Sequence, residues 1–153
     1  MSSSLNLIFN LKHQEGIVMQ TMSWKERYSV GVEEIDRQHR GLLDIMNQIT
    51  NSFEKKDDWQ ATSAIINSLI HYAYNHLATE ERYMMEAEYP ELSLHIELHI
   101  AFMRKVFLLS EEYKQHGLAL QKEILAYLAN WYSSHVLEAD RKYMSSMEKK
   151  GIT

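Results

Sequence analysis

The sequence predicts an all-α fold: an antiparallel up-down-up-down four-helix bundle with an N-terminal extended arm. Three observations lead to this fold class. The 153 residues contain one proline and five glycines, and residues that favour helix, such as Leu, Met, Glu and Lys, are abundant. Apolar residues recur three or four positions apart in four long segments, as they do in helices that bury one face. Short connections between long helices favour antiparallel neighbours.

Length and composition fit one domain that needs no disulfides. A chain of 153 residues can bury a sizeable core. It has no cysteine, so a metal site would use nitrogen and oxygen ligands. We divide the chain into an N-terminal extension, residues 1–22, and a four-helix domain, residues 23–153. The extension shows neither a strong helical period nor caps, and we expect it to be disordered, or non-native and upstream of a start at Met22.

The charge and hydropathy patterns exclude several function classes. The chain has 16 basic and 21 acidic residues, a net charge of -5, without a basic block, which argues against binding to nucleic acid. The longest apolar runs fall far short of the ~20 residues that a membrane span needs. The early segment SLNLIFNL lacks the basic region of a signal peptide. We therefore expect a soluble, cytoplasmic protein that binds no membrane.

The first elements are an arm and a long helix. Residues 23–34 contain Trp24 and Tyr28 and are interrupted by Gly31, so we expect an extended arm whose aromatic side chains pack across the helices. A helix then spans about residues 34–53, because one face carries the stripe of a bundle helix. Its members are Ile35, His39, Leu42, Met46, Ile49 and Phe53.

Three more helices follow. Asp57 with Gln60 resembles a capping box that opens the second helix. We place Pro90 in the first turn of the third helix, where its missing N–H has no helical partner. Gly117 ends the third helix, and Gly151 lies just past the end of the fourth. The stripes of these helices include Ile65, Leu69, Ala73, His76 and Glu80, then Leu92, His95, His99, Phe102 and Val106, then Ile124, Leu128, Trp131 and His135.

Seven polar residues lie on or beside these stripes, where the pattern expects core residues. His76 and Glu80 are four residues apart, and so are His95 and His99, so each pair projects from one helix face. In this topology the starts of the first and third helices and the ends of the second and fourth lie at one end of the bundle. All seven therefore converge on one level of the core. They are His39, His76, Glu80, His95, His99, His135 and Asp140.

A buried cluster of this kind requires compensation, because an unpaired carboxylate in an apolar core is costly. One solution is a hydrogen-bonded polar cluster without metal, and the other is a metal centre. Convergence of seven such residues favours the metal. Seven ligands are too many for one tetrahedral zinc but suit two octahedral ions that share bridging carboxylates, and five histidines favour iron over magnesium or calcium.

Positions around the cluster carry further expectations. His135 and Asp140 are five residues apart, about 140° around an ideal helix, so a shared centre requires a distorted helix or long side-chain reach. Tyr143, one turn beyond Asp140, is expected beside the site. The remaining histidines lie off the stripes and are expected at the surface: His13, His71 and His116.

From Trp24 to about Tyr143 the sequence resembles the bacterial hemerythrins. The resemblance rests on four segments: VGVEEIDRQH at 30–39, HLATEE at 76–81, YPELSLHIELH at 89–99 and WYSSHVLEAD at 131–140. It implies a di-iron centre with an oxygen-derived bridge, in which dioxygen binds the open two-histidine iron and is reduced to the peroxide level by both irons. Position by position, it implies that His95, His99 and His135 bind one iron, that His39 and His76 bind the other, and that Glu80 and Asp140 bridge them.

The residues themselves favour oxygen binding over oxidation. Ferritin-like di-iron oxidases use Glu-x-x-His motifs from two helices, and this chain has none. Five neutral imidazoles with two carboxylates leave the centre cationic, which should stabilise ferrous iron. We therefore predict reversible oxygen storage, delivery or sensing and no enzyme activity. The alternatives are a di-iron redox enzyme that handles peroxide or nitric oxide, and a sensor module. A protein partner or a homo-oligomer stays open.

Six residues are candidates for the shell around bound oxygen. A closed apolar shell would restrict water, although these side chains could equally be ordinary core. Members of the resembled family commonly have leucine at the position of Tyr132. Its phenol could donate a hydrogen bond to a ligand, occupy the open iron or face away. The six candidates are Leu42, Leu77, Phe102, Trp131, Tyr132 and Val136.

Overall fold

The computed structural model describes residues 21–153, so the predicted extension at 1–22 lies almost entirely outside the described residues. All regular secondary structure in the described residues is helical, and they contain no strand. Its long helices are α1 (Glu33–Lys55), α2 (Trp59–Glu86), α3 (Leu92–His116) and α4 (Gln121–Ser134). The short helical segments are η2 (Glu26–Tyr28), η3 (Gly117–Leu120), η4 (His135–Ala139), η5 (Asp140–Tyr143) and α5 (Met144–Lys149).

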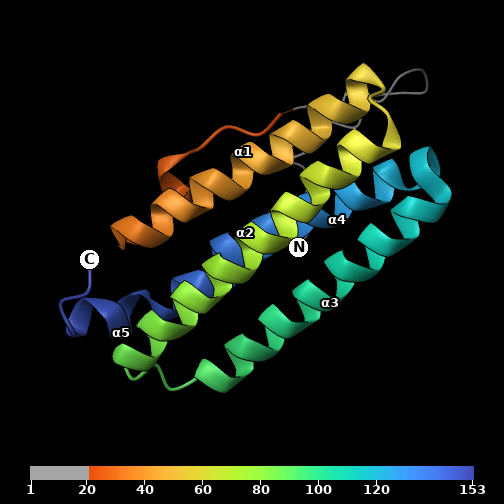
Figure 1. The fold of residues 1–153 in the computed structure, drawn as a ribbon. Helices are drawn as coiled ribbons and strands as arrows, with labels where there is room; N and C mark the ends of the chain where they lie inside the picture. Colours follow the sequence, from red (N-terminus) through yellow and green to blue (C-terminus); the bar gives the residue numbers. More distant parts are fainter. Residues whose placement is uncertain (1–20) are drawn as a thin grey trace, which may run out of the picture.

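The long helices form the predicted antiparallel bundle. Helix α1 packs against α2 and α4, and α3 packs against the same two helices, so the four close on one another. The starts of α1 and α3 lie at the same end as the end of α2 and α5 (Figure 1). The fold class predicted from the sequence is therefore confirmed. Among residues 21–153, no helix has the length and apolarity that a bilayer crossing requires.

Two predicted helix boundaries are wrong. Helix α2 is capped by Asp58 and not by Asp57, because the Asp58 side chain accepts a hydrogen bond from the Ala61 N–H at 2.8 Å. Helix α3 begins at Leu92, beyond Pro90. The Leu92 N–H donates to the Tyr89 carbonyl at 3.2 Å, which makes Pro90 the second residue of a turn between helices. Proline favours that position because its φ is fixed there.

The core consists of two apolar clusters at different levels along the bundle axis. One apolar cluster occupies the end that contains Phe53, Ile66 and Tyr113. A second, smaller cluster at the other end contains Ile35 and Met147. Each long helix passes through both clusters or ends at their boundary, and the polar stripe residues fall between the two. The apolar periodicity therefore leaves one polar layer inside an otherwise apolar core.

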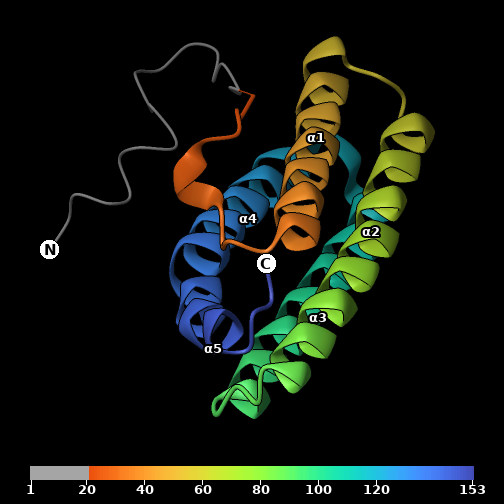
Figure 2. The same ribbon diagram turned by 90° about the vertical axis from the view of Figure 1, so that its left-hand side faces the viewer.

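The arm before α1 packs as predicted. Figure 2 shows it lying beside α1 and α4. The Tyr28 ring packs edge-to-face on Trp24 at 5.7 Å and on Tyr132 at 5.6 Å between centroids. The Val30 N–H donates to the Asp36 carboxylate at 2.8 Å, and the Ser29 hydroxyl donates to its other oxygen. These contacts fix the arm to the first turns of α1.

Replacing Asp36 with alanine is expected to loosen the arm. The buried Val30 N–H would lose its acceptor, and hydrogen bonds to charged groups contribute about 1.5–3 kcal/mol. Urea unfolding should show a stability loss of about that size, with Asp36→Asn intermediate because the amide oxygen can still accept. Asp44→Ala, an exposed aspartate on the same helix, is the control. Equal midpoints for the two alanine variants would contradict the assignment.

Candidate metal centre

The seven polar stripe residues come together in the layer between the two apolar clusters. All are buried, with at most 3% of any of them exposed. Helix α1 contributes one residue and α2 contributes two. Helix α3 contributes two more, and the last two stand at the starts of η4 and η5. In that order they are His39, His76, Glu80, His95, His99, His135 and Asp140.

The five-residue spacing of His135 and Asp140 is accommodated by a change of helix type. Segment η4 is a π-helix, in which the Asp140 N–H donates to the His135 carbonyl. A π-helix bonds residues five apart, so it brings both side chains to the same face. Of the two solutions expected from the sequence, helix distortion is the one adopted.

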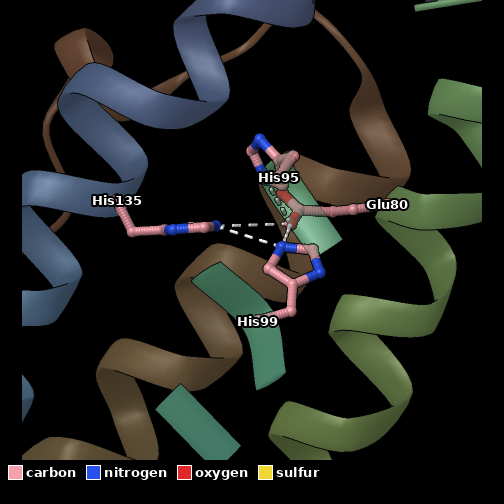
Figure 3. A group of neighbouring side chains, drawn as sticks. All are labelled: Glu80, His95, His99 and His135. Carbon is pink, nitrogen blue, oxygen red and sulfur yellow. Dashed lines mark hydrogen bonds and ion pairs between the residues drawn. The ribbon is translucent and has the colours of Figure 1, made fainter. Parts of the chain in front are cut away.

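The ligand atoms fall into two groups that share Glu80. In the first group, ligand atoms of Glu80, His95, His99 and His135 all lie within 4.8 Å of one another. Figure 3 shows these four side chains pointing toward a common centre. In the second group, Glu80 meets His39 and His76 within the same distance. One carboxylate therefore stands between three histidines and two histidines.

Glu80 turns a different oxygen toward each group. Its Oε1 lies 3.4 Å from His39 Nε2 and 3.6 Å from His76 Nε2. Its Oε2 lies 3.2 Å from His99 Nε2 and 3.9 Å from His135 Nε2. A carboxylate in this position can bind two metal ions, one through each oxygen.

Asp140 divides its oxygens in the same way. Its Oδ2 lies 3.2 Å from His39 Nε2. Its Oδ1 lies 3.0 Å from His135 Nε2 and 3.3 Å from His95 Nε2. Two carboxylates thus span both groups, and the donor set of five imidazoles and two carboxylates fits two ions of the iron type.

Many of the inward-facing atoms have no hydrogen-bond partner among the described residues. Buried polar atoms are ordinarily paired, so a group of unpaired donor and acceptor atoms at one point needs a partner of another kind. Metal ions would supply it, because each of these atoms is a metal-ligand atom. The atoms facing the cluster are His39 Nε2, His76 Nε2, His95 Nε2, Glu80 Oε2 and both carboxylate oxygens of Asp140.

Burial and the two carboxylates act in opposite directions on the pKa values of the histidines in the cluster. Burial alone lowers the pKa of His39, but the adjacent carboxylates of Asp140 and Glu80 raise it to about 9. Burial also lowers the pKa of His135, but Asp140 and Glu80 raise it to about 10. Burial dominates at His76 and lowers its pKa to about 4. Burial would raise the pKa of each carboxyl, but the surrounding imidazoles hold both well below the usual range. Metal ions that bind here would displace protons from the imidazoles.

Three side chains outside the cluster hold its members in place. Gln38 Oε1 accepts from His76 Nδ1 at 2.9 Å, and Glu81 Oε1 accepts from His99 Nδ1 at 2.8 Å. The buried Tyr143 hydroxyl donates to Glu80 Oε1 at 2.7 Å. Tyr143 lies beside the site as expected. Gln38 and Glu81 were not predicted as site residues, and the one sequence signal for them is that each stands next to a candidate ligand.

The oxygen-shell candidates are core residues around the cluster. Five are buried and Trp131 is half-buried. The Trp131 ring stacks on His135 at 4.7 Å and on Phe102 at 3.7 Å between centroids. The remaining candidates belong to the larger apolar cluster: Leu42, Leu77, Tyr132 and Val136.

Tyr132 lies at the two-histidine side of the cluster. Its ring centroid is 6.3 Å from that of His39, and its hydroxyl donates to the His39 main-chain carbonyl at 3.2 Å. The hydroxyl therefore neither points into the cluster nor reaches a metal-ligand atom. Burial raises the pKa of Tyr132 strongly, so the phenol stays protonated. Of the three orientations considered from the sequence, the hydroxyl faces away.

The other histidines do not join the cluster. His71 and His116 are exposed, as predicted. His13 lies outside the described residues.

Comparison with known proteins adds evidence independent of the geometry. Residues 30–145 match the family model described as "Hemerythrin HHE cation binding domain". The chain is 33% identical to a bacteriohemerythrin of Clostridium acetobutylicum over 128 residues, which cover 79% of this chain and 97% of that protein. It is 26% identical to a bacteriohemerythrin of Stenotrophomonas maltophilia, with 85% and 84% covered. It is 23% identical to a myohemerythrin of Theromyzon tessulatum, with 81% and 92% covered.

Proposed function

The chain belongs to the hemerythrin family, and from this premise we propose that it binds dioxygen reversibly at a di-iron centre. The role would be oxygen storage, delivery or sensing. One observation carries the proposal. Two buried carboxylates each turn one oxygen toward a group with three histidines and the other toward a group with two.

The ligand assignment follows the two groups. We propose that Glu80 and Asp140 bridge the irons. The three-histidine side is supplied by α3 and η4, and the two-histidine side by α1 and α2. Because the second side has one histidine fewer, it would be the side that can accept dioxygen. The proposed terminal ligands are His95, His99 and His135 on one side and His39 and His76 on the other.

An iron pair, when bound, supplies two electrons to dioxygen and recovers them on release. The chain's own residues would determine whether that exchange stays reversible. The buried rings and aliphatic side chains around the cluster would keep water out, and water would otherwise promote irreversible oxidation of the iron pair. The ligand set is rich in neutral imidazoles, so it supports ferrous iron. We therefore propose an oxygen-binding protein and not an enzyme.

The test is an optical titration of anaerobically reduced, iron-loaded protein with oxygen. A visible charge-transfer band should appear with oxygen and disappear when the oxygen is removed, with recovery of the reduced spectrum. Direct passage to a stable diferric spectrum would contradict reversible binding. Rapid catalytic turnover of peroxide or nitric oxide by the iron-loaded protein would instead support the redox-enzyme alternative.

The rate of autoxidation is expected to depend on the ring of Tyr132 and not on its hydroxyl. The ring fills the space between His39 and the arm, whereas the hydroxyl is bonded to a main-chain carbonyl. Tyr132→Leu should leave a gap that admits water and should autoxidise several-fold faster. Tyr132→Phe keeps the ring and should behave like the parent. Spectrophotometric decay of the oxygenated form measures both, and equal acceleration in the two variants would assign the effect to the hydroxyl.

A further inference from the structure

We propose that Glu81 is a positioning residue, and that the carboxylate behind His99 makes the three-histidine side the stronger metal-binding side. This inference rests on the proposed function only in requiring that the cluster bind a pair of metal ions. In His76 and His99 the inner nitrogen, Nε2, faces the cluster, and the outer nitrogen, Nδ1, faces away from it. The hydrogen bond made by the outer nitrogen determines which nitrogen carries the proton and how the ring is oriented.

The contact at His99 has one chemical interpretation. Glu81 Oε1 lies 2.8 Å from His99 Nδ1, and an ionised carboxylate can only accept. Nδ1 must therefore carry the proton, so Nε2 of the neutral ring presents its lone pair. That Nε2 faces Glu80 Oε2 at 3.2 Å and His135 Nε2 at 3.2 Å. Glu81 thus selects the tautomer that can bind a metal in the three-histidine group.

A chain of hydrogen bonds selects the same tautomer at His76 with a neutral acceptor. The Thr79 hydroxyl donates to the Asn75 carbonyl at 3.0 Å, so its oxygen is free to accept from the Gln38 amide nitrogen at 3.2 Å. This orients the amide oxygen of Gln38 toward His76 Nδ1 at 2.9 Å. His76 therefore also presents Nε2 inward, but it is supported by an amide and not by a carboxylate.

The difference between the two acceptors makes the sides unequal. A charge-assisted hydrogen bond is roughly twice as strong as a neutral one, and a carboxylate partner raises the basicity of a ligating imidazole. His99 gains that support and His76 does not. On the same two-histidine side, His39 Nδ1 has no partner among the described residues. The outer nitrogens of His95 and His135 likewise make no hydrogen bond to another described residue, so the two sides differ in the acceptor behind His99 and the one behind His76, and only the three-histidine side has a charged acceptor.

The position of Glu81 explains how α2 supplies both a metal ligand, Glu80, and a residue that orients a histidine ligand on another helix. It follows Glu80 directly, so it lies about 100° further around α2. Glu80 points into the core while Glu81 points toward α3, with 29% of its side chain exposed. Among residues 21–153, His99 is its one basic partner within 4 Å. No lysine or arginine among residues 21–153 forms an ion pair with Glu81, so its contact with His99 is specific and not part of a surface network.

Cobalt(II) is a suitable probe because it reports on ligand geometry without dioxygen chemistry. It shifts the ring N–H protons of ligating histidines far from other proton resonances, so each retained N–H is seen separately by NMR. The variants are Glu81→Ala, Glu81→Gln and Gln38→Ala in the full chain. The matched control is Glu97→Gln, which removes one exposed charge from α3 near the same histidines.

We expect Glu81→Ala to lose one shifted N–H resonance to solvent exchange and to weaken cobalt binding about 10- to 100-fold, as loss of such a partner typically does. Glu81→Gln should retain the resonance at a changed position, with intermediate affinity, because its amide oxygen can accept. Gln38→Ala should remove a different resonance with a smaller loss of affinity. Glu97→Gln should match the parent in both measurements.

Two results would overturn the inference. One is a Glu81→Ala protein that keeps every shifted N–H resonance and the parent affinity. The other is a Glu97→Gln protein that loses as much affinity as Glu81→Ala, which would assign the effect to net charge. A parent that binds no cobalt would overturn the metal pair itself, whereas a failed oxygen titration with normal cobalt results would overturn only the proposed function.

Discussion

Replacing Glu80 with alanine is expected to abolish binding of both metal ions. Glu80 belongs to both ligand groups, with Oε1 at 3.4 Å from His39 Nε2 and Oε2 at 3.2 Å from His99 Nε2. Its removal takes a ligand from each side and leaves buried imidazoles without one of their two carboxylates. Metal content after anaerobic iron loading and removal of free iron should fall from two ions per chain to nearly none.

The control for this prediction is a substitution that affects one side only. His76→Ala removes a ligand from the two-histidine group and leaves the three-histidine group complete, so it should retain about one ion per chain. The visible response to oxygen should vanish in both variants. A Glu80→Ala protein that holds one ion as firmly as His76→Ala does would show that the carboxylate is not shared.

Replacing Phe102 with alanine is expected to cause a large loss of stability in the metal-free protein. Phe102 is buried in the larger apolar cluster and stacks on Trp131 at 3.7 Å. Truncating a buried phenylalanine to alanine costs about 3–5 kcal/mol, because apolar contacts are lost and a cavity remains. Urea unfolding followed by circular dichroism measures the change in the free energy of unfolding.

The same helix supplies a matched control. Phe107 lies five residues further along α3 with 56% of its surface exposed, so Phe107→Ala should change the free energy of unfolding by no more than about 0.5 kcal/mol. Both variants lose the same atoms, and only burial differs between them. Similar unfolding midpoints for the two would mean that the stack of Phe102 on Trp131 contributes little to the fold.

Much of the candidate site could be predicted because its residues follow the helical period. His39 and Glu80 occupy stripe positions where apolar neighbours on both sides are buried, so their helices had to direct them inward. The antiparallel topology then placed them at one level. The five-residue spacing of His135 and Asp140 also indicated a local distortion of the helix as one of two solutions, and the π-helix η4 is that distortion. That these residues bind iron remains a prediction for the loading experiments.

The boundaries that were wrong depend on interactions that a residue pattern does not contain. Asp57 and Asp58 are adjacent and equally good caps by residue type. Asp58 caps α2 because its oxygen reaches the Ala61 N–H. Pro90 could stand in a first turn or in the preceding turn. The hydrogen bond from Leu92 to Tyr89 places it in the turn.

The sequence by itself determined which side chains enter the core, since burial of one helix face follows from a one-dimensional period of apolar residues. Only the tertiary structure decided which atoms meet there. The division of the Glu80 oxygens between two groups, the direction of the Tyr132 hydroxyl and the contact of Glu81 with His99 all join different helices. Such contacts depend on how the helices are rotated against one another and on side-chain rotamers, and neither is encoded in the spacing along one helix.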